Sequence, residues 1–232
     1  KLSILSTLCF GYEIAPDKMR VEGISNITQH DIQVAAELGY KIKLLGIAER
    51  TESGIEQRVH PTFVPKGSAI AGVDGVMNAV ALETDHVHEL LLAGPGAGGP
   101  PTASSVLSDI LDIARGTRVP PLGVPSDELL PYREAPHRAH EGGFYIRLSA
   151  KDVAGALAAI ATRMGEKSIS IDSVIQRSDL SAKAIAPDGS PARTVVMITQ
   201  QTLESSVREA LAQIADDGFI VGEPQLIRIE KL

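Results

Sequence analysis

The chain has 232 residues, of which 44% are hydrophobic, 3% aromatic and 22% charged, and its formal net charge is −7. This length suits one large or two modest domains, with a core made mostly of Ala, Val, Ile and Leu. An acidic chain without a basic stripe excludes nucleic acid and anionic membrane as expected partners. No apolar run is long enough to span a bilayer, and a single cysteine forms no internal disulfide, which favours a reducing cytoplasm.

The first predicted element is a helix over residues 1–11, with apolar side chains at helical spacing and Gly11 to end it. The chain begins with Lys1 rather than Met, and no N-cap residue precedes this helix. We therefore expect the chain to be the later part of a longer polypeptide. Cys9 lies on the apolar side of the helix, and we expect it in the core rather than as a nucleophile.

A second helix is predicted over residues 28–38, capped by Thr28 and ended by Gly39. Its apolar stripe consists of Ile32, Ala35, Ala36 and Leu38. Alternating side chains and Pro or Gly punctuation predict strands over residues 41–48, 57–64, 76–82 and 89–93. Strands with flanking helices indicate an α+β region with a mixed sheet.

A glycine-rich turn, Gly94-Pro95-Gly96-Ala97-Gly98-Gly99-Pro100-Pro101, then leads into a predicted helix over residues 102–115. Three glycines two apart remove side chains from one side of the backbone, so a ligand can approach its N–H groups. Thr102 is the predicted N-cap, and a helix N-terminus favours negative charge or a polarised oxygen. The alternative is a tight turn that lets the helix pack against a neighbouring layer. The helix's apolar positions are Val106, Leu107, Ile110, Leu111 and Ile113.

Three parts are predicted: a first region over residues 1–117, a proline-rich linker over 118–142, and a second region over 143–232. In the second region the periodicity predicts strands over 144–148, 169–175, 194–199 and 226–229. It also predicts two helical stripes, Leu157, Ile160, Ala161 and Met164, then Leu203, Val207, Leu211 and Ile214. The order is βαββαβ, a ferredoxin-like arrangement with helices on one face and a long hairpin over residues 177–191.

The turn after the first of these strands, Ser149-Ala150-Lys151-Asp152-Val153-Ala154-Gly155, has Asp152 as a plausible N-cap. Gly155 removes a side chain where the helix begins, so a ligand carboxylate could meet free N–H groups. A plain capped helix is the alternative. The βαββαβ order with Asp-x-x-Gly resembles ACT domains, which commonly bind amino acids at a subunit interface. The resemblance implies an effector site at Asp152, Val153, Ala154 and Gly155, although Ala154 stands where the family usually has Pro.

Five motifs of the first region resemble the homoserine dehydrogenase family, in the family's order and with an ACT domain after them. They are Val21-Glu22-Gly23-Ile24, Leu38-Gly39-Tyr40-Lys41-Ile42-Lys43-Leu44-Leu45-Gly46, Val59-His60-Pro61-Thr62-Phe63-Val64-Pro65, Val76-Met77-Asn78-Ala79-Val80 and the stretch from Gly94 to Ser104. The resemblance implies NAD- or NADP-dependent interconversion of L-aspartate 4-semialdehyde and L-homoserine, on the route to threonine, methionine and isoleucine. It also implies L-threonine as effector and a homo-oligomer, with a dimer expected.

The family's N-terminal Rossmann domain is expected to lie outside this chain, which leaves NAD and NADP undistinguished. In the family, the counterpart of the glycine turn lies near the nicotinamide and the substrate, which implies cofactor-binding roles for Gly94, Gly96, Ala97, Gly98 and Thr102. The following helix packs on the nucleotide-binding domain. Without that domain we expect its apolar face to be exposed and the site to be half built.

Lys1 matches the lysine that ends the family's Asp-x-x-x-Lys pattern, which implies that it is catalytic. Hydride addition to an aldehyde builds negative charge on oxygen, and a nearby ammonium stabilises that charge or donates a proton. In the oxidation direction a neutral amine accepts the hydroxyl proton. The alternative for Lys1 is a solvated terminal side chain.

The remaining candidates are weaker. His86 and His88 favour a solvated turn over a metal site, so no metal is predicted. His60 favours a hydrogen-bonded structural role over a catalytic base. Three functions stay open: part of a dehydrogenase, a stand-alone amino-acid-binding regulator, or a dimerisation module. The isolated chain is expected not to turn over.

Overall fold

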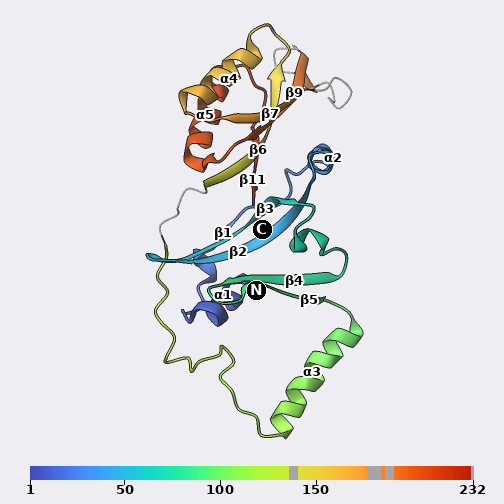
Figure 1. Cartoon of the computed structure of the whole chain (residues 1–232), viewed down its shortest axis with the longest axis vertical. Coiled ribbons are helices and arrows are strands. Elements are labelled where there is room, and N and C mark those ends of the chain that lie inside the picture. Colours follow the sequence, from blue (N-terminus) through green and yellow to red (C-terminus); the bar gives the residue numbers. More distant parts are fainter. Residues whose placement is uncertain (136–140, 177–183, 186–190, 231–232) are drawn as a thin grey trace.

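The computed structural model describes residues 1–135, 141–176, 184–185 and 191–230 (Figure 1). The first part contains, in order, α1 (Leu2–Phe10), η1 (Pro16–Lys18), β1 (Arg20–Val21), α2 (Gln29–Glu37), β2 (Tyr40–Thr51), β3 (Gly54–Pro65), η2 (Ala69–Gly72), β4 (Met77–Thr84), β5 (His88–Pro95) and α3 (Gly99–Ala114). The second part contains β6 (Glu141–Lys151), α4 (Ala156–Glu166), β7 (Ile171–Gln176), β8 (Ala184–Ile185), β9 (Pro191–Thr199), β10 (Thr202–Leu203), α5 (Glu204–Asp216) and β11 (Gln225–Ile229). The predicted helices and strands are present with shifted ends, while the predicted 177–191 hairpin falls largely outside the described residues.

One nine-stranded mixed sheet runs through both parts of the chain, in the order β1-β3-β11-β6-β9-β7 with β2 also on β3. The two parts join where β11 pairs in parallel with β3, with Arg228 opposite Thr62. The β4–β5 hairpin forms a separate two-stranded sheet, and α3 stands apart at the bottom of Figure 1. None of the described helices combines the length and apolar character needed to cross a membrane.

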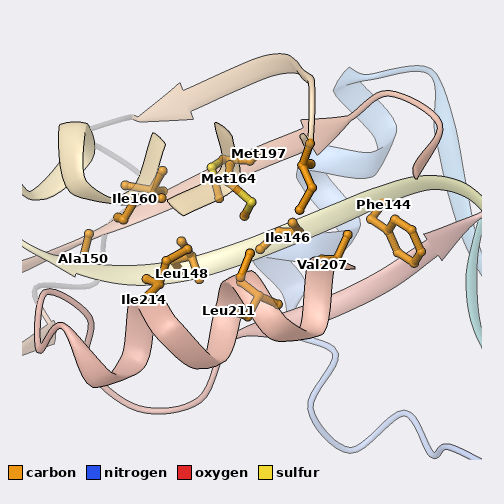
Figure 2. Close-up of a cluster of buried hydrophobic side chains, with 13 residues drawn as sticks. Phe144, Ile146, Leu148, Ala150, Ile160, Met164, Met197, Val207, Leu211 and Ile214 are labelled. Carbon is orange, nitrogen blue, oxygen red and sulfur yellow. The ribbon is translucent and has the colours of Figure 1, made fainter. Parts of the chain in front are cut away.

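The second part follows the predicted βαββαβ order, with neighbouring strands β11, β6, β9 and β7. Side chains of β6 and β9 meet those of α4 and α5 in a buried core (Figure 2). Figure 2 shows Val207, Leu211 and Ile214 of α5 directed at the strands, with Met164 of α4 opposite Met197. Burying apolar side chains on both layers is what drives such a helix-on-sheet fold.

Helix α2 covers the other face of this sheet, close to the junction of the two parts. Val34 and Ala35 are fully buried there against Phe63 and Tyr145, whose rings stack with centroids 4.6 Å apart. The predicted stripe of α2 was partly wrong, because Ile32 is 54% exposed and Ala36 is also exposed. The buried face instead includes Asp31, whose carboxylate is held by groups of β6, and this turns Ile32 outward.

Helix α1 corrects two further expectations. The side chains that it buries are Ser3, Ser6 and Thr7, while its apolar side chains Ile4 and Leu8 are about half exposed. Cys9 is also exposed, so its predicted core position was wrong. The small side chains suit close packing on the sheet, and two of their hydroxyls are hydrogen-bonded to the backbone: Thr7 donates to the Ser3 carbonyl and Ser3 Oγ accepts from the Ala15 N–H.

The stripes of α4 and α5 needed smaller corrections. Leu157 of α4 is 42% exposed, Ala161 is also exposed, and the buried positions are Ala156, Ile160 and Met164. Leu203 precedes α5 and is partly exposed, whereas the next residue, Glu204, is buried because it pairs with Arg228. Both differences shift the buried face of a helix by about one residue, which tertiary contacts decide and periodicity alone does not.

Residues 130–135 of the segment predicted as a linker are bound to the first part by hydrogen bonds. The Leu130 N–H donates to the Gly11 carbonyl at 2.9 Å, and the Ile55 N–H donates to the Arg133 carbonyl at 2.8 Å. The Tyr132 hydroxyl donates to the Ile55 carbonyl at 3.1 Å. These contacts hold residues 130–135 against α1 and the β2–β3 hairpin.

Candidate functional site

The glycine turn lies at the open end of the β4–β5 hairpin. The last cross-strand pairs are Asn78 with Gly94 and Met77 with Pro95, after which the Gly96 N–H donates to the Val76 carbonyl at 2.9 Å. Beside this end is an open hollow of about 270 Å³, lined by Asn78, Ala79, Val80, Leu92, Ala93, Gly94, Pro95 and Gly96. Four of the five residues implied as cofactor-binding follow in the turn, and Gly94 and Gly96 line the hollow itself.

The start of α3 differs from the sequence prediction. The N-cap is Gly98, with φ 128°, and Pro100 and Pro101 occupy the first turn. Thr102 is therefore inside the helix, where its N–H donates to the Gly98 carbonyl at 3.2 Å, and its predicted capping role was wrong. Proline is tolerated in a first turn because those N–H groups have no helical partner.

The two prolines also change what this helix end can bind. A helix N-terminus attracts anions through its free N–H groups. Pro100 and Pro101 have none, so only the N–H groups of Gly98 and Gly99 remain free of helical bonding. The turn thus offers an accessible backbone with few donors, which suits the close approach of a flat or apolar group better than a phosphate.

Gly94, Gly96 and Gly99 also satisfy the Gly-x-Gly-x-x-Gly spacing of dinucleotide-binding loops. In such loops the glycines follow a strand of a parallel βαβ unit. Here the preceding strand, β5, pairs antiparallel with β4, and those two strands form their own sheet in the described chain. The spacing therefore lacks the structural context of a Rossmann fingerprint.

The helix that follows the turn presents its whole apolar face to solvent. Val106, Leu107, Ile110, Leu111 and Ile113 are 49–76% exposed, and α3 buries none of its residues. The predicted exposed face is thus confirmed. Lys1, implied as catalytic, is also exposed; it precedes α1, and its carbonyl accepts from the Leu5 N–H. Among the described residues, no hydrogen bond or ion pair joins Lys1 to the glycine turn.

The implied effector loop lies between β6 and α4, away from the hairpin. Asp152 does not cap α4: its carboxylate accepts from Arg193 Nε at 2.7 Å, and the helix begins four residues later, at Ala156. The N-cap is Gly155, whose φ of 90° is a left-handed conformation that favours glycine. Nothing lies within 4 Å of a Cβ built on Gly155, so the glycine is required by the backbone rather than by space.

The histidines differ in their surroundings. His60 is 1% exposed in β3, and its Nδ1 lies 3.0 Å from Thr62 Oγ1. Burial, with the charge of Arg228 as a smaller cause, lowers the pKa of His60 to about 4, which fits a neutral structural role. His86 and His88 are exposed where β4 turns into β5. The described residues contain no group of three or more His, Cys, Asp or Glu placed to hold a metal ion.

Two buried ionic clusters at the junction of the parts were missed by the sequence analysis. Arg228 of β11 donates to Glu22 at 3.0 Å and to Glu204 at 2.8 Å. Burial alone would raise the pKa of both carboxyls, but the hydrogen bonds and charge of Arg228 outweigh it and lower them. Of the three residues in this cluster, only Glu22 lies within one of the five family motifs, so only Glu22 could have been singled out from the sequence.

The second cluster surrounds Asp31, which is fully buried. Its carboxylate accepts from the Tyr145 hydroxyl at 2.6 Å, from Arg147 Nε at 2.7 Å, and from the N–H and hydroxyl of Thr28. Burial would raise the pKa of Asp31, and these donors lower it instead. The capping box Thr28–Asp31 thus also fastens α2 to β6.

Comparison with known proteins shows what the chain is similar to. The model of the homoserine dehydrogenase family matches residues 1–111. A homoserine dehydrogenase of Pseudomonas aeruginosa is 40% identical over 100% of this chain and 53% of its own length, and one of Neisseria gonorrhoeae is 39% identical with the same coverage. The crystal structure of a homoserine dehydrogenase from Thiobacillus denitrificans superposes with a TM-score of 0.83 at 40% identity, covering 100% of this chain and 52% of that one. The chain spans about half the length of these relatives. Over its whole length the chain is similar to homoserine dehydrogenases.

Proposed function

We propose that this chain is the substrate-side and regulatory part of a homoserine dehydrogenase, the enzyme that interconverts L-aspartate 4-semialdehyde and L-homoserine with NAD or NADP. The observation that carries the proposal is the similarity to proteins of that name along the entire chain, through both parts of the fold. The glycine turn supports it, since a bare backbone beside an open hollow suits a bound ring.

The residues of the turn fit one edge of a nicotinamide cofactor. A Cβ built on Gly94 or Gly99 would meet nothing within 4 Å, so the backbone is open to a ligand there. The cofactor supplies or accepts a hydride when bound. In this chain Gly94, Gly96, Ala97 and Gly98 would form one wall of its site, and Thr102 would stabilise that wall through its hydrogen bond to Gly98.

Lys1 is the proposed acid–base group. In the reductive direction its ammonium stabilises the oxygen of the aldehyde and donates the proton that completes the alcohol. In the oxidative direction the neutral amine accepts the hydroxyl proton. Residues outside this chain complete the site, so the chain by itself is proposed to be inactive.

The second part is proposed to be an ACT domain that binds an amino-acid effector, with L-threonine as the first candidate. Its βαββαβ order and the open Gly155 N-cap support this. The loop of Asp152, Val153, Ala154 and Gly155 is the proposed contact for the effector carboxylate. A dimer is the proposed assembly, and it would be measured by light scattering.

Two experiments test these proposals. The part of the Pseudomonas aeruginosa relative that precedes the matched region is joined to Lys1, and homoserine-dependent reduction of NAD or NADP is followed at the absorbance of the reduced cofactor. We expect turnover in this chimera, at least a hundredfold loss with Lys1→Ala, and none from the chain alone. Turnover by the chain alone, or full activity of Lys1→Ala, contradicts the proposal.

Calorimetry of L-threonine with the chain alone tests the regulator. Saturable heat is expected if the second part senses this amino acid. Absence of binding removes threonine as effector and leaves the dehydrogenase proposal standing. Binding without any activity in the chimera favours the alternative function, a stand-alone amino-acid-binding regulator.

A further inference from the structure

Asn78 is the one polar side chain among the residues that line the hollow beside the glycine turn. It lies at the end of β4, directly opposite Gly94 on β5. Its side chain is exposed, and its Nδ2 donates to the Val76 carbonyl at 3.3 Å. Among the described residues, no hydrogen bond to its Oδ1 is present. Packing alone therefore does not explain an Asn at this position.

The side chain of Asn78 lies against the backbone of Gly96. A Cβ built on Gly96 would lie 1.7 Å from Asn78 Nδ2 and 2.5 Å from its Cγ. The backbone of Gly96 is outside the left-handed region, so its conformation does not require glycine. The carboxamide of Asn78 therefore occupies the space that a side chain at position 96 would need.

A shared acceptor ties the same two residues together. The Val76 carbonyl receives both the Gly96 N–H, at 2.9 Å, and Asn78 Nδ2. The last cross-strand pair is Met77 with Pro95. These two hydrogen bonds to the Val76 carbonyl therefore fix the turn to the end of the hairpin. A carbonyl with two lone pairs can accept both at once.

We propose that Asn78 is a positioning residue for the glycine turn, holding the backbone at Gly96 in the path that the bound cofactor requires. The carboxamide packs on Gly96 and anchors to the carbonyl that fixes it, so turn and strand move as one unit. This role rests on the proposed dehydrogenase function for its catalytic consequence. The positioning itself is testable in the chain alone.

Amide hydrogen exchange of the Gly96 N–H, followed by NMR, measures the positioning directly. Asn78→Ala is expected to speed exchange at Gly96 by about tenfold or more, because the hydrogen bond to Val76 loses its support. Thr84→Ala is the matched control: Thr84 Oγ1 accepts from the Val87 N–H at the opposite end of the same hairpin. It should leave Gly96 unchanged. Unaltered exchange at Gly96 in Asn78→Ala, or equal acceleration by Thr84→Ala, overturns the proposal.

A double-mutant cycle in the active chimera measures the catalytic consequence. Gly96→Ala is expected to lower kcat/KM for the cofactor by about tenfold or more by displacing the Asn78 carboxamide, and by much less when Asn78→Gly has already removed it. The unfolding free energy should stay the same in all variants. An equal effect of Gly96→Ala in both backgrounds overturns the proposal. An inactive but folded chimera contradicts the proposed function instead, and the exchange experiment then still decides the positioning.

Discussion

Two regions of this molecule, the βαββαβ part and the β4–β5 hairpin with α3, are built in opposite ways. The βαββαβ part closes its own core, with side chains such as Ile160, Met164 and Met197 at 0–1% exposure. The β4–β5 hairpin and α3 have no buried residue along their lengths. An isolated two-stranded hairpin or a helix of this length is marginal in water, since most of the stability of such elements comes from packing.

The proposed sites differ in the same way. The βαββαβ region carries the proposed effector loop on a rigid frame. The glycine turn lies between the β4–β5 hairpin and α3, whose apolar side chains are exposed. Stability is therefore expected to be concentrated in the sheet and its helices, and to be nearly insensitive to changes in residues 76–115.

The largest effect is expected where the two parts meet. Arg228→Met leaves the buried Glu204 without its main cation and is expected to lower the unfolding free energy by about 4 kcal/mol, measured by urea denaturation. Arg208→Met is the matched control, because the half-exposed Arg208 binds the same carboxylate at 2.7 Å. Its cost should stay below about 1 kcal/mol. Equal costs would show that the junction is not a buried ionic cluster.

Shortening one side chain in the core and one on α3 tests the difference in stability between the two regions. Met164→Ala removes a fully buried side chain and is expected to cost about 3 kcal/mol of unfolding free energy. Leu107→Ala removes a similar volume from the 58% exposed position on α3 and should change stability by less than about 0.5 kcal/mol. A large loss with Leu107→Ala would mean that α3 is packed in solution, for example in a dimer.

The pH dependence of stability should also originate in the sheet. His60 has a pKa of about 4 when folded and about 6.5 when unfolded, so the unfolded state binds the proton first as the pH falls. Stability from His60 is complete above pH 6.5 and is lost between pH 6.5 and about 4, amounting to roughly 3 kcal/mol. Urea denaturation of His60→Gln over this range should show a flatter profile than the unaltered chain. Parallel profiles would contradict a buried neutral His60.

The smallest expected effect concerns the effector loop. Gly155→Asp places a negative charge at the N-cap of α4 and is expected to weaken L-threonine binding several-fold in calorimetry. Gly155→Ala is the control, since it imposes the same left-handed strain without the charge. If both variants bind threonine equally, the carboxylate does not lie at this helix end.

Periodicity in the sequence was enough to predict the order of the helices and strands, since the apolar side chains of β6 and β9 alternate and those of α5 recur at helical spacing. It failed where polar residues are buried. Asp31 belongs to the inner face of α2, and Ser3 and Thr7 to the inner face of α1, because specific hydrogen bonds compensate their burial. Hydrophobicity carries no signal for such positions.

The candidate site was located by its glycines, but its details were not predictable in the same way. Thr102 is a good capping residue by type, yet the helix begins before it, with Pro100 and Pro101 in the first turn. Asn78 acquires its proposed role only through Gly96, which lies beyond the last cross-strand pair and against the Asn78 carboxamide. Arg228 and Glu22 are 206 residues apart, a pairing that depends on β11 lying beside β3.

The most direct test of the account is amide hydrogen exchange by mass spectrometry on the chain alone and on the chimera with the Pseudomonas aeruginosa segment. We expect residues 76–115 to exchange faster than the peptides of β6, β9 and α5 in the chain alone and to gain protection in the chimera, while those peptides stay protected in both. Strong protection of α3 in the chain alone, or no gain of protection in an active chimera, would contradict the proposal that this region contributes one side of a catalytic site.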